Sequence, residues 1–369
     1  MRLSFFDRRV LSHFDFLLIL LLLPIVGLSF FLVSEISTML ALKQLAYVTV
    51  AIVCFIVVFF FPLRKYIWLI PFFYWINILL LIAVKLFGVT KLGAKRWLEI
   101  PFLELTIQPS ELMKPAFILM LGYIIARRPP SKDGYEWIEF FKISFYILLP
   151  FFLIASEPDL GTATIILLVG GGVLLSVGIK RKIWVTLLSL FLLSSTIIYD
   201  NLHDYQKKRI SDFLAEKPSY HVQQSIIAIG SGGFFGKDKE DSTQTQLKFL
   251  PISSSDFIFA YLVERFGFFG ALIVILLYAS LILNLLSLTQ KVKKDYQVSV
   301  VIVAVAILLF LYMSINISMT IGLAPVVGVP LPLFSHGGSS FITFIVLFAI
   351  IENLLVSRFK HIYDFDIKI

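Results

Sequence analysis

The sequence predicts an all-α, polytopic membrane protein with ten transmembrane helices in one membrane domain, residues 1–369. Its 369 residues are 59% hydrophobic and 15% charged, and the mean hydropathy is +0.92. Soluble domains have about 45–50% apolar and about 25% charged residues, so much of this surface must face lipid. Long charge-free runs agree, because a spanning helix needs about 20 largely apolar residues.

Most spans follow directly from charge-free runs, and one very long run is divided in two by its prolines and glycines. Two spans are less clean, because one carries Glu111 and Lys114 at its start and another is short. In chain order the predicted spans cover residues 16–34, 44–63, 66–84, 109–126, 140–156, 160–179, 183–199, 266–290, 297–319 and 339–357.

Basic residues gather in the loops on one side of the predicted membrane. Arg64 and Lys65 follow span two, and the cluster 180–182 follows span six. This pattern marks the cytoplasmic side, so we expect both termini in the cytoplasm and the chain in the cytoplasmic (inner) membrane. It also explains the net charge of +8 without a nucleic-acid partner.

The longest outer segment, residues 200–256, separates spans seven and eight. Loops of this length are more often functional than idle. Val222, Ile226 and Ile229 have helical spacing, which predicts a short helix lying on the membrane surface. The glycine-rich stretch 230–236 could hold a phosphate with its backbone N–H groups, although a flexible turn is the simpler interpretation.

The start of span four carries two ionisable groups in the sequence QPSELMKP. Glu111 and Lys114 are three residues apart and therefore share a helical face. Charges near hydrocarbon are costly, so a structural ion pair is one interpretation. The other is that the pair lines a polar cavity with Gln108 and Ser110, where Lys114 meets an anionic substrate.

Outer carboxylates also lie at two other predicted helix starts. Glu157 and Asp159 precede span six, where acidic residues ordinarily complement the helix dipole. Asp256 precedes span eight, where it either caps the helix or acts as a general base. A carboxylate at a helix N-terminus is expected to stay ionised, as a general base must be.

The sequence has no signature of chemistry on soluble metabolites. It contains neither a P-loop nor a dinucleotide fingerprint, and its five histidines lack metal-ligand spacing. Its single cysteine, Cys54, excludes an intrachain disulfide. The polar outer loop, the outer carboxylate and the Glu–Lys pair indicate work on an amphipathic, anionic molecule at the outer leaflet.

Five sequence blocks, in a fixed order along nearly the whole chain, carry a family resemblance. They are WLEIPFLELTIQPSELMKPA (97–116), EPDLGTA (157–163), YHVQQSIIAIGSGGFFGK (220–237), TQTQLKFLP with DFIFAYLVERFG (243–267), and GLAPVVGVPLPLFSHGGSS (322–340). Together they resemble the shape, elongation, division and sporulation (SEDS) family of RodA, FtsW and SpoVE. The sequence TQTQLKFLP favours the RodA branch.

The resemblance implies a peptidoglycan glycosyltransferase, a hexosyltransferase that polymerises lipid II on its undecaprenyl pyrophosphate carrier. The active site would face outside, and the strands would serve cell elongation and rod shape. A class B penicillin-binding protein, which crosslinks the strands, would be its partner in the elongation machinery.

The resemblance also assigns residues. Asp256 matches the family's essential acidic residue, Glu111 and Lys114 its span-four pair, and Asp159 its PDLG aspartate. Lys114 and Arg209 are expected to stabilise the leaving pyrophosphate. No metal site made of protein ligands is expected, although a divalent cation, Mg²⁺ or Mn²⁺, is a further candidate.

The sequence departs from the family pattern in its outer loops. GKDK (236–239) stands where GKGW is usual, ISSS (252–255) where a Glu and a His are usual, and His336 where Tyr is frequent.

Two other function classes stay open on the sequence. Ten spans around a polar pair would also suit a lipid II flippase, which needs no outer carboxylate at a helix start. A non-catalytic scaffold for a penicillin-binding protein would leave Asp256 and Lys114 dispensable.

Overall fold

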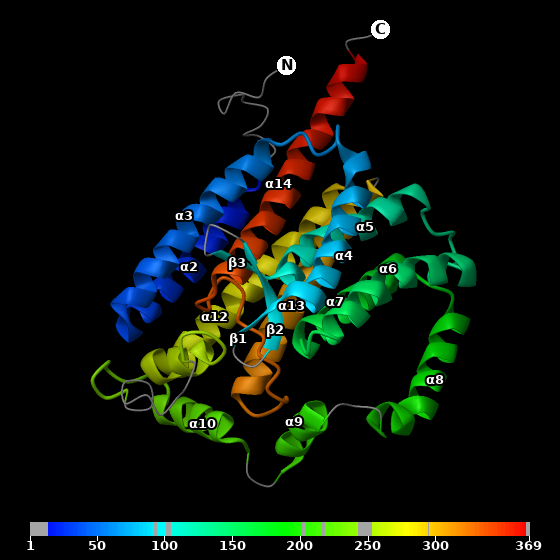
Figure 1. The fold of residues 1–369 in the computed structure, drawn as a ribbon. Coiled ribbons are helices and arrows are strands. Elements are labelled where there is room, and N and C mark those ends of the chain that lie inside the picture. The colour runs from blue at the N-terminus through cyan, green and yellow to red at the C-terminus, as the bar shows by residue number, and fades with distance from the viewer. Residues whose placement is uncertain are drawn as a thin grey trace.

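The fold is a bundle of long apolar helices, seen in a computed structural model (Figure 1). The structure describes residues 14–91, 94–100, 105–200, 204–215, 218–242, 253–293 and 295–366. The bundle helices are α2 (Phe16–Ile36), α3 (Thr38–Phe60), α4 (Ile70–Phe87, preceded by the 3₁₀ turn Ile67–Leu69), α5 (Pro109–Arg127), α6 (Trp137–Ala155), α7 (Leu160–Val177), α12 (Ile258–Lys291), α13 (Tyr296–Thr320) and α14 (Gly338–Asp366).

Within the described residues, nine helices are long and apolar enough to cross a membrane, and they coincide with nine predicted spans. The predicted span 183–199 falls within α8 (Arg181–Asp200), which is helical but is not among the nine. The start of α2 and the end of α14 lie at one end of the bundle, as predicted for termini on the same side (Figure 1). The helices α9 (Asp204–Leu214) and α10 (Tyr220–Gly232) lie at the opposite end.

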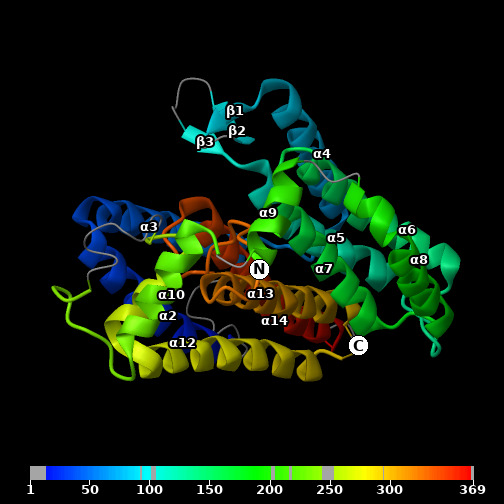
Figure 2. The same ribbon diagram turned by 90° about the horizontal axis from the view of Figure 1, so that it is seen from below.

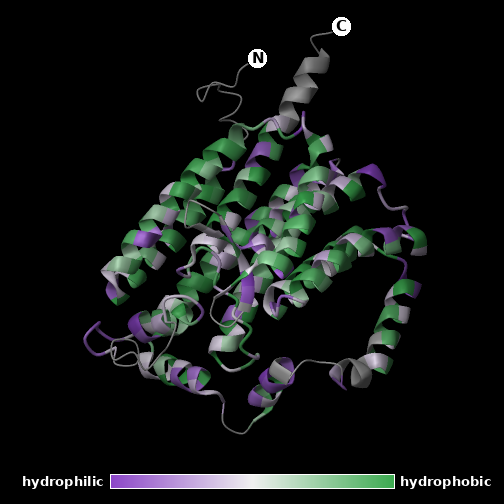
Figure 3. Cartoon of the chain, viewed as in Figure 1, coloured by the Kyte–Doolittle hydropathy of each residue, from purple (hydrophilic) through white to green (hydrophobic). Residues whose placement is uncertain are grey.

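The centre of the bundle is formed by α5, α13 and α14. In the most apolar stretch of α5 and of α14, 78% of the residues are buried, against 17% in α3. The helix α3 therefore faces outward and α5 inward. The helix α13 contacts α5, α7, α12 and α14 and therefore connects the two halves of the bundle. Figure 3 shows hydrophobic residues along the bundle helices and more hydrophilic residues on α9.

The segment between spans three and four is a small antiparallel sheet, which the all-α prediction missed. Its strands are β1 (Val89–Lys91), β2 (Ala94–Ile100) and β3 (Leu105–Ile107), in the order β1-β2-β3. The register pairs Glu99 with Thr106 in β2 and β3. Figure 2 shows the sheet and α12 at opposite edges of the molecule. Because β2 contacts both α4 and α5, the sheet brings its side chains to the start of span four.

The long helix α12 is kinked at Gly267, whose φ of 64° lies in the left-handed region. A Cβ at this position would lie 2.4 Å from the backbone nitrogen of Gly236, so only glycine fits there. The predicted span 266–290 begins at this kink, whereas α12 itself begins at Ile258. The extra turns before the kink extend the helix toward Asp256.

Candidate active site

Glu111 and Lys114 form the predicted ion pair on α5. Lys114 Nζ donates to Glu111 Oε1 over 2.6 Å, and the lysine side chain is only 1% exposed. The same ammonium lies 4.8 Å from the ring centroid of Tyr312 on α13. The pair neutralises both charges inside the bundle, which favours the structural interpretation.

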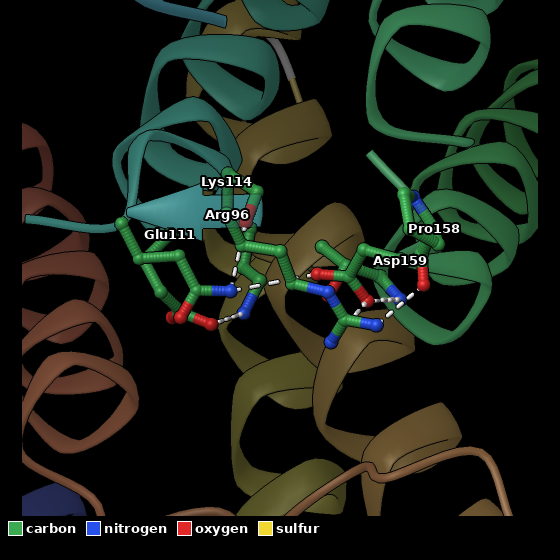
Figure 4. Close-up of polar contacts among 8 residues, drawn as sticks. Arg96, Glu111, Lys114, Pro158 and Asp159 are labelled. Atoms are coloured by element: carbon green, nitrogen blue, oxygen red, sulfur yellow. Dashed lines mark hydrogen bonds and ion pairs between the residues drawn. The ribbon is translucent and has the colours of Figure 1, made fainter. Parts of the chain in front are cut away.

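Arg96, Gln108 and Asp159 form a second network beside this pair (Figure 4). Arg96 Nη1 lies 3.6 Å from Asp159 Oδ1, and Arg96 also donates to the carbonyl of Pro158. Gln108 Nε2 donates to Ser110 Oγ (3.1 Å) and to Asp159 Oδ2 (3.4 Å). The structure thus brings the predicted residues Gln108, Ser110, Glu111, Lys114 and Asp159 together.

Asp159 has a structural role as well, because it caps α7. Its Oδ1 accepts a hydrogen bond from the backbone N–H of Thr162 at 3.3 Å, which is the ordinary role expected at a helix start. Arg96 is a site residue that the sequence did not reveal. One arginine in a charged outer segment looks like any exposed loop residue, and only the pairing of β2 with its neighbours places it here.

Several buried atoms of this cluster have no hydrogen-bond partner among the described residues. They include both carboxyl oxygens of Glu157, Oε2 of Glu111 and Nε of Arg96. Glu157 is 3% exposed. Burial and the nearby charge of Asp159 raise its pKa to about 8, against the opposing effect of Arg96. Several unpaired buried polar atoms in one cluster need an explanation, such as a bound ligand.

Asp256 lies in the turn that precedes α12 and does not cap this helix. The N-cap position is Phe257, and the first turn of α12 has no side-chain cap. Burial raises the pKa of the Asp256 carboxyl above its usual value, and a hydrogen bond with Ser255 opposes the shift. The raised pKa makes Asp256 a stronger base than an ordinary aspartate, and its ionisation at neutral pH stays a prediction.

Three contacts fix the turn that carries Asp256. Asn316 Nδ2 donates to the Asp256 carbonyl over 2.9 Å, and Ser335 Oγ donates to the Ser255 carbonyl over 2.6 Å. The backbone N–H of His336 donates to the Ser254 carbonyl over 2.8 Å. The segment before α14 thus holds Ser254 and Ser255 in place.

A loop before α14 approaches both Asp256 and the cluster around Asp159. A Cβ added at Gly161, two residues after Asp159, would lie 2.7 Å from the carbonyl oxygen of Val327. A Cβ added at the next residue, Gly328, would lie 3.7 Å from Oδ2 of Asp256. Both groups of functional side chains therefore lie close to the same short loop.

Arg209 is not brought to this site by any contact in the described part of the chain. It is a partly exposed residue of α9, and neither a hydrogen bond nor an ion pair connects it to Asp256, Lys114 or Asp159 there. Its role in binding pyrophosphate stays a prediction. The block TQTQLKFLP, residues 243–251, lies outside the described residues.

The helix predicted within the outer loop is α10. Val222 is buried, whereas Ile226 is 41% exposed. The buried positions are Val222, Ser225, Ala228 and Gly232, because this helix packs against α12. The contact with α12 covers this face, and the placement of α10 on the membrane surface stays a prediction.

The glycine-rich stretch packs against α12, and no phosphate cradle is needed to explain it. A Cβ at Gly232 would lie 2.0 Å from the Val263 carbonyl oxygen. The backbone N–H of Lys237 donates to the Glu264 carbonyl over 3.0 Å, and that of Phe268 donates to the Gly233 carbonyl over 2.9 Å. The glycines permit close approach of the loop to the kinked helix.

The described residues contain no group of three or more His, Cys, Asp or Glu side chains placed to hold a metal ion. The requirement for Mg²⁺ or Mn²⁺ stays a prediction.

Comparison with known proteins places this architecture in a family. Residues 6–360 match the family model of cell cycle proteins FtsW, RodA and SpoVE. The chain is 52% identical over 363 residues to the peptidoglycan glycosyltransferase MrdB of Helicobacter pylori, covering 98% of this chain and 94% of that protein. It is 35% identical over 365 residues to MrdB of Escherichia coli, covering 96% of each.

Solved structures show the same fold. A chain from a structure described as "Structural coordination of polymerization and crosslinking by a peptidoglycan synthase complex" aligns with a TM-score of 0.80 and 25% identity, over 94% of this chain and 98% of that one. The rod shape determining protein RodA of Thermus thermophilus aligns with a TM-score of 0.69 and 25% identity, over 94% and 97%. The chain is a multi-pass membrane protein that belongs to the FtsW/RodA/SpoVE family.

Proposed function

We propose that this chain is a peptidoglycan glycosyltransferase that polymerises lipid II into glycan strands for cell elongation and rod shape. The names of the two MrdB relatives support the activity, since the sequence match covers nearly all of this chain. The observation that carries the proposal is Asp256, a carboxyl group of raised pKa in a turn fixed by contacts from α13 and from the segment before α14.

In the proposed reaction, Asp256 is the general base. The 4-hydroxyl oxygen of the incoming lipid II attacks the anomeric carbon of the growing strand while its proton passes to the Asp256 carboxylate. The bond from that carbon to the pyrophosphate oxygen breaks, and undecaprenyl pyrophosphate leaves with the electron pair. General-base assistance of this kind is typically worth about 10²–10⁴-fold in rate.

The ion pair on α5 supports this reaction indirectly. Because Glu111 and Tyr312 already contact the Lys114 ammonium, its charge is balanced before any substrate binds. We propose that the pair holds α5 and α13 in register and that Lys114 does not act as a free cation for pyrophosphate.

Two further parts of the proposal concern place and partner. The positive-inside pattern supports the cytoplasmic membrane, with Asp256 on the outer side. The synthase complex among the structural matches combines polymerisation with crosslinking. We therefore propose a class B penicillin-binding protein as the partner of this chain within the elongation machinery.

The test uses purified full-length chain, with and without its transpeptidase partner, and lipid II as substrate. Asp256→Asn is expected to abolish glycan polymerisation while keeping partner binding and the melting temperature. Asp241→Asn, on the exposed part of the same outer loop, is the matched control and is expected to polymerise normally. Long glycan made by Asp256→Asn would refute the assignment of this base.

The same variants separate the two alternative classes. A buried ion pair within a span also suits a lipid II flippase, which would translocate lipid II in liposomes and lose this activity without Lys114 rather than without Asp256. If the chain is a scaffold, its partner would still make glycan strands when both Lys114 and Asp256 of this chain are replaced.

A further inference from the structure

Glu157 is a buried acidic residue that the proposed mechanism does not use. It lies in the turn between α6 and α7, is 3% exposed, and neither of its oxygens has a partner among the described residues. Burying a carboxyl group without a hydrogen-bond partner costs free energy of folding. Most buried polar groups in proteins therefore have a partner. A bound molecule that pairs with the carboxyl group would offset this cost.

The charges around Glu157 cancel without it. Arg96 and Lys114 carry two positive charges, and Glu111 and Asp159 carry two negative charges, within the connected contacts of β2, α5 and the α6–α7 turn. An anionic pyrophosphate would meet no net positive charge in this cluster. A neutral ligand would meet no electrostatic penalty.

The unpaired atoms define the hydrogen bonds that such a ligand needs. Oε2 of Glu111 is an acceptor, Nε of Arg96 is a donor, and a protonated Glu157 carboxyl is both. A complementary ligand therefore carries both donors and acceptors close together. Sugar hydroxyl and acetamido groups have this character, and a phosphate, which offers acceptors alone at neutral pH, lacks it.

We propose that Glu157, Arg96 and Glu111 form a subsite for a neutral, hydrogen-bonding sugar of the lipid-linked substrate, bound through its hydroxyl or acetamido groups. The inference rests on the proposed function, because that function supplies a sugar substrate. Glu157 is a substrate-binding residue in this assignment, while Asp256 alone takes the proton.

Glu157 binds in its neutral form, so binding has a defined pH dependence. The charged groups that face it are Asp159 from its own turn and Arg96 from β2. Because burial and Asp159 raise its pKa to about 8, Glu157 is protonated at neutral pH. Above that value it ionises, loses its donor and adds a negative charge, so affinity for the sugar falls.

The experiment compares Glu157→Gln, Glu157→Leu and the exposed-loop control Glu240→Gln in the full-length chain. Glutamine keeps the shape and both hydrogen-bonding functions, so its KM for lipid II is expected to stay within roughly threefold of wild type at pH 7. Leucine removes the hydrogen bonds and is expected to raise KM by about tenfold or more with a smaller change in kcat. Wild type and Glu240→Gln should lose affinity above about pH 8, and Glu157→Gln should not.

Equilibrium binding of fluorescently labelled lipid II to the same variants separates this proposal from the proposed function. If wild type binds lipid II but makes no glycan, the polymerase assignment fails while the subsite is still measured. The subsite is refuted if Glu157→Leu binds and uses lipid II like wild type. It is also refuted if the pH dependence of Glu157→Gln matches that of wild type, even where the leucine variant fails to fold.

Discussion

Tyr312 and Asn316 lie one helical turn apart on α13, and each supports one half of the active site. The ring of Tyr312 lies 4.8 Å from the Lys114 ammonium, and Asn316 Nδ2 donates to the Asp256 carbonyl over 2.9 Å. Residues four apart on a helix lie about 5–6 Å from each other on one face. The helix α13 therefore sets the spacing between the α5 ion pair and the turn that carries the base.

Asn316 connects α13 directly to the turn that carries Asp256. It is fully buried, and its amide also donates to the Val329 carbonyl over 2.8 Å, in the loop beside the base. Asn316→Leu keeps the volume but frees both carbonyls, so the Asp256 turn should move. We expect kcat for glycan polymerisation to fall by about ten- to a hundredfold, since small misplacements of a catalytic group are costly, with lipid II still bound.

The control for this prediction is Asn284→Leu at the opposite end of the bundle. Asn284 also makes a side-chain hydrogen bond, a partly buried one to Asp15 Oδ2 at 2.5 Å, far from the base. It should lower thermal stability without reducing kcat. Equal losses of kcat in the two variants would mean that general loosening of the bundle, not the position of Asp256, is being measured.

The sequence predicted the functional side chains better than the contacts between them. Charge-free runs and basic loops locate nine helices, and helical spacing alone pairs Glu111 with Lys114. Arg96 was missed because its position depends on strand pairing in a segment read as a loop. The environment of Asp256 could not be predicted for a similar reason, since it comes from α13 and from the segment before α14, which lie far along the chain.

The α5 ion pair gives a prediction about stability. Lys114→Met leaves the Glu111 carboxylate buried without its partner, which typically costs about 3–5 kcal/mol. We expect a clear loss of thermal stability in detergent for Lys114→Met. The double variant Lys114→Met/Glu111→Gln should recover much of that loss, because no uncompensated charge is left behind.

A thermal unfolding series of the two single variants and the double variant measures this coupling. Additive losses would show that the two side chains do not depend on each other in the folded protein. Activity measured in parallel separates the roles: a stable double variant that polymerises lipid II would make the pair purely structural.

Asp256 gives a prediction about pH. Burial raises its pKa above the usual 3.8, and the base acts only when ionised. The rate kcat/KM should therefore rise with pH through a limb displaced upward from the range of an ordinary aspartate, because this ratio reports the free enzyme. An acid limb at or below the ordinary value would contradict the buried environment of this carboxyl.

The same shift has a consequence for stability. A folded-state pKa above the unfolded value means that folding favours the protonated carboxyl, so stability is lost as pH rises through the folded pKa. Asp256→Asn cannot ionise and avoids this penalty. At pH 7 we expect its melting temperature to equal or exceed that of wild type, and a lower value would show that the carboxylate stabilises the fold.

The glycine-rich loop gives a prediction with a built-in control. Gly230 and Gly232 both lie in α10, but a Cβ at Gly232 would lie 2.0 Å from the Val263 carbonyl, whereas a Cβ at Gly230 would have no atom within 4 Å. Gly232→Ala must therefore push α10 away from α12. Because the neighbour is backbone of α12, this change should lower thermal stability and, through the turn before α12, reduce polymerisation.

Gly230→Ala makes the opposite change in the same helix. Alanine is favoured over glycine in a helix interior by about 0.5–1 kcal/mol, so Gly230→Ala should keep or slightly raise thermal stability and keep normal polymerisation. Thermal unfolding and lipid II polymerisation of the two variants, measured side by side, check both halves of the prediction. If Gly232→Ala behaves like Gly230→Ala, the close packing of α10 on α12 does not position the base, and the glycines of this stretch would have to be explained by a ligand.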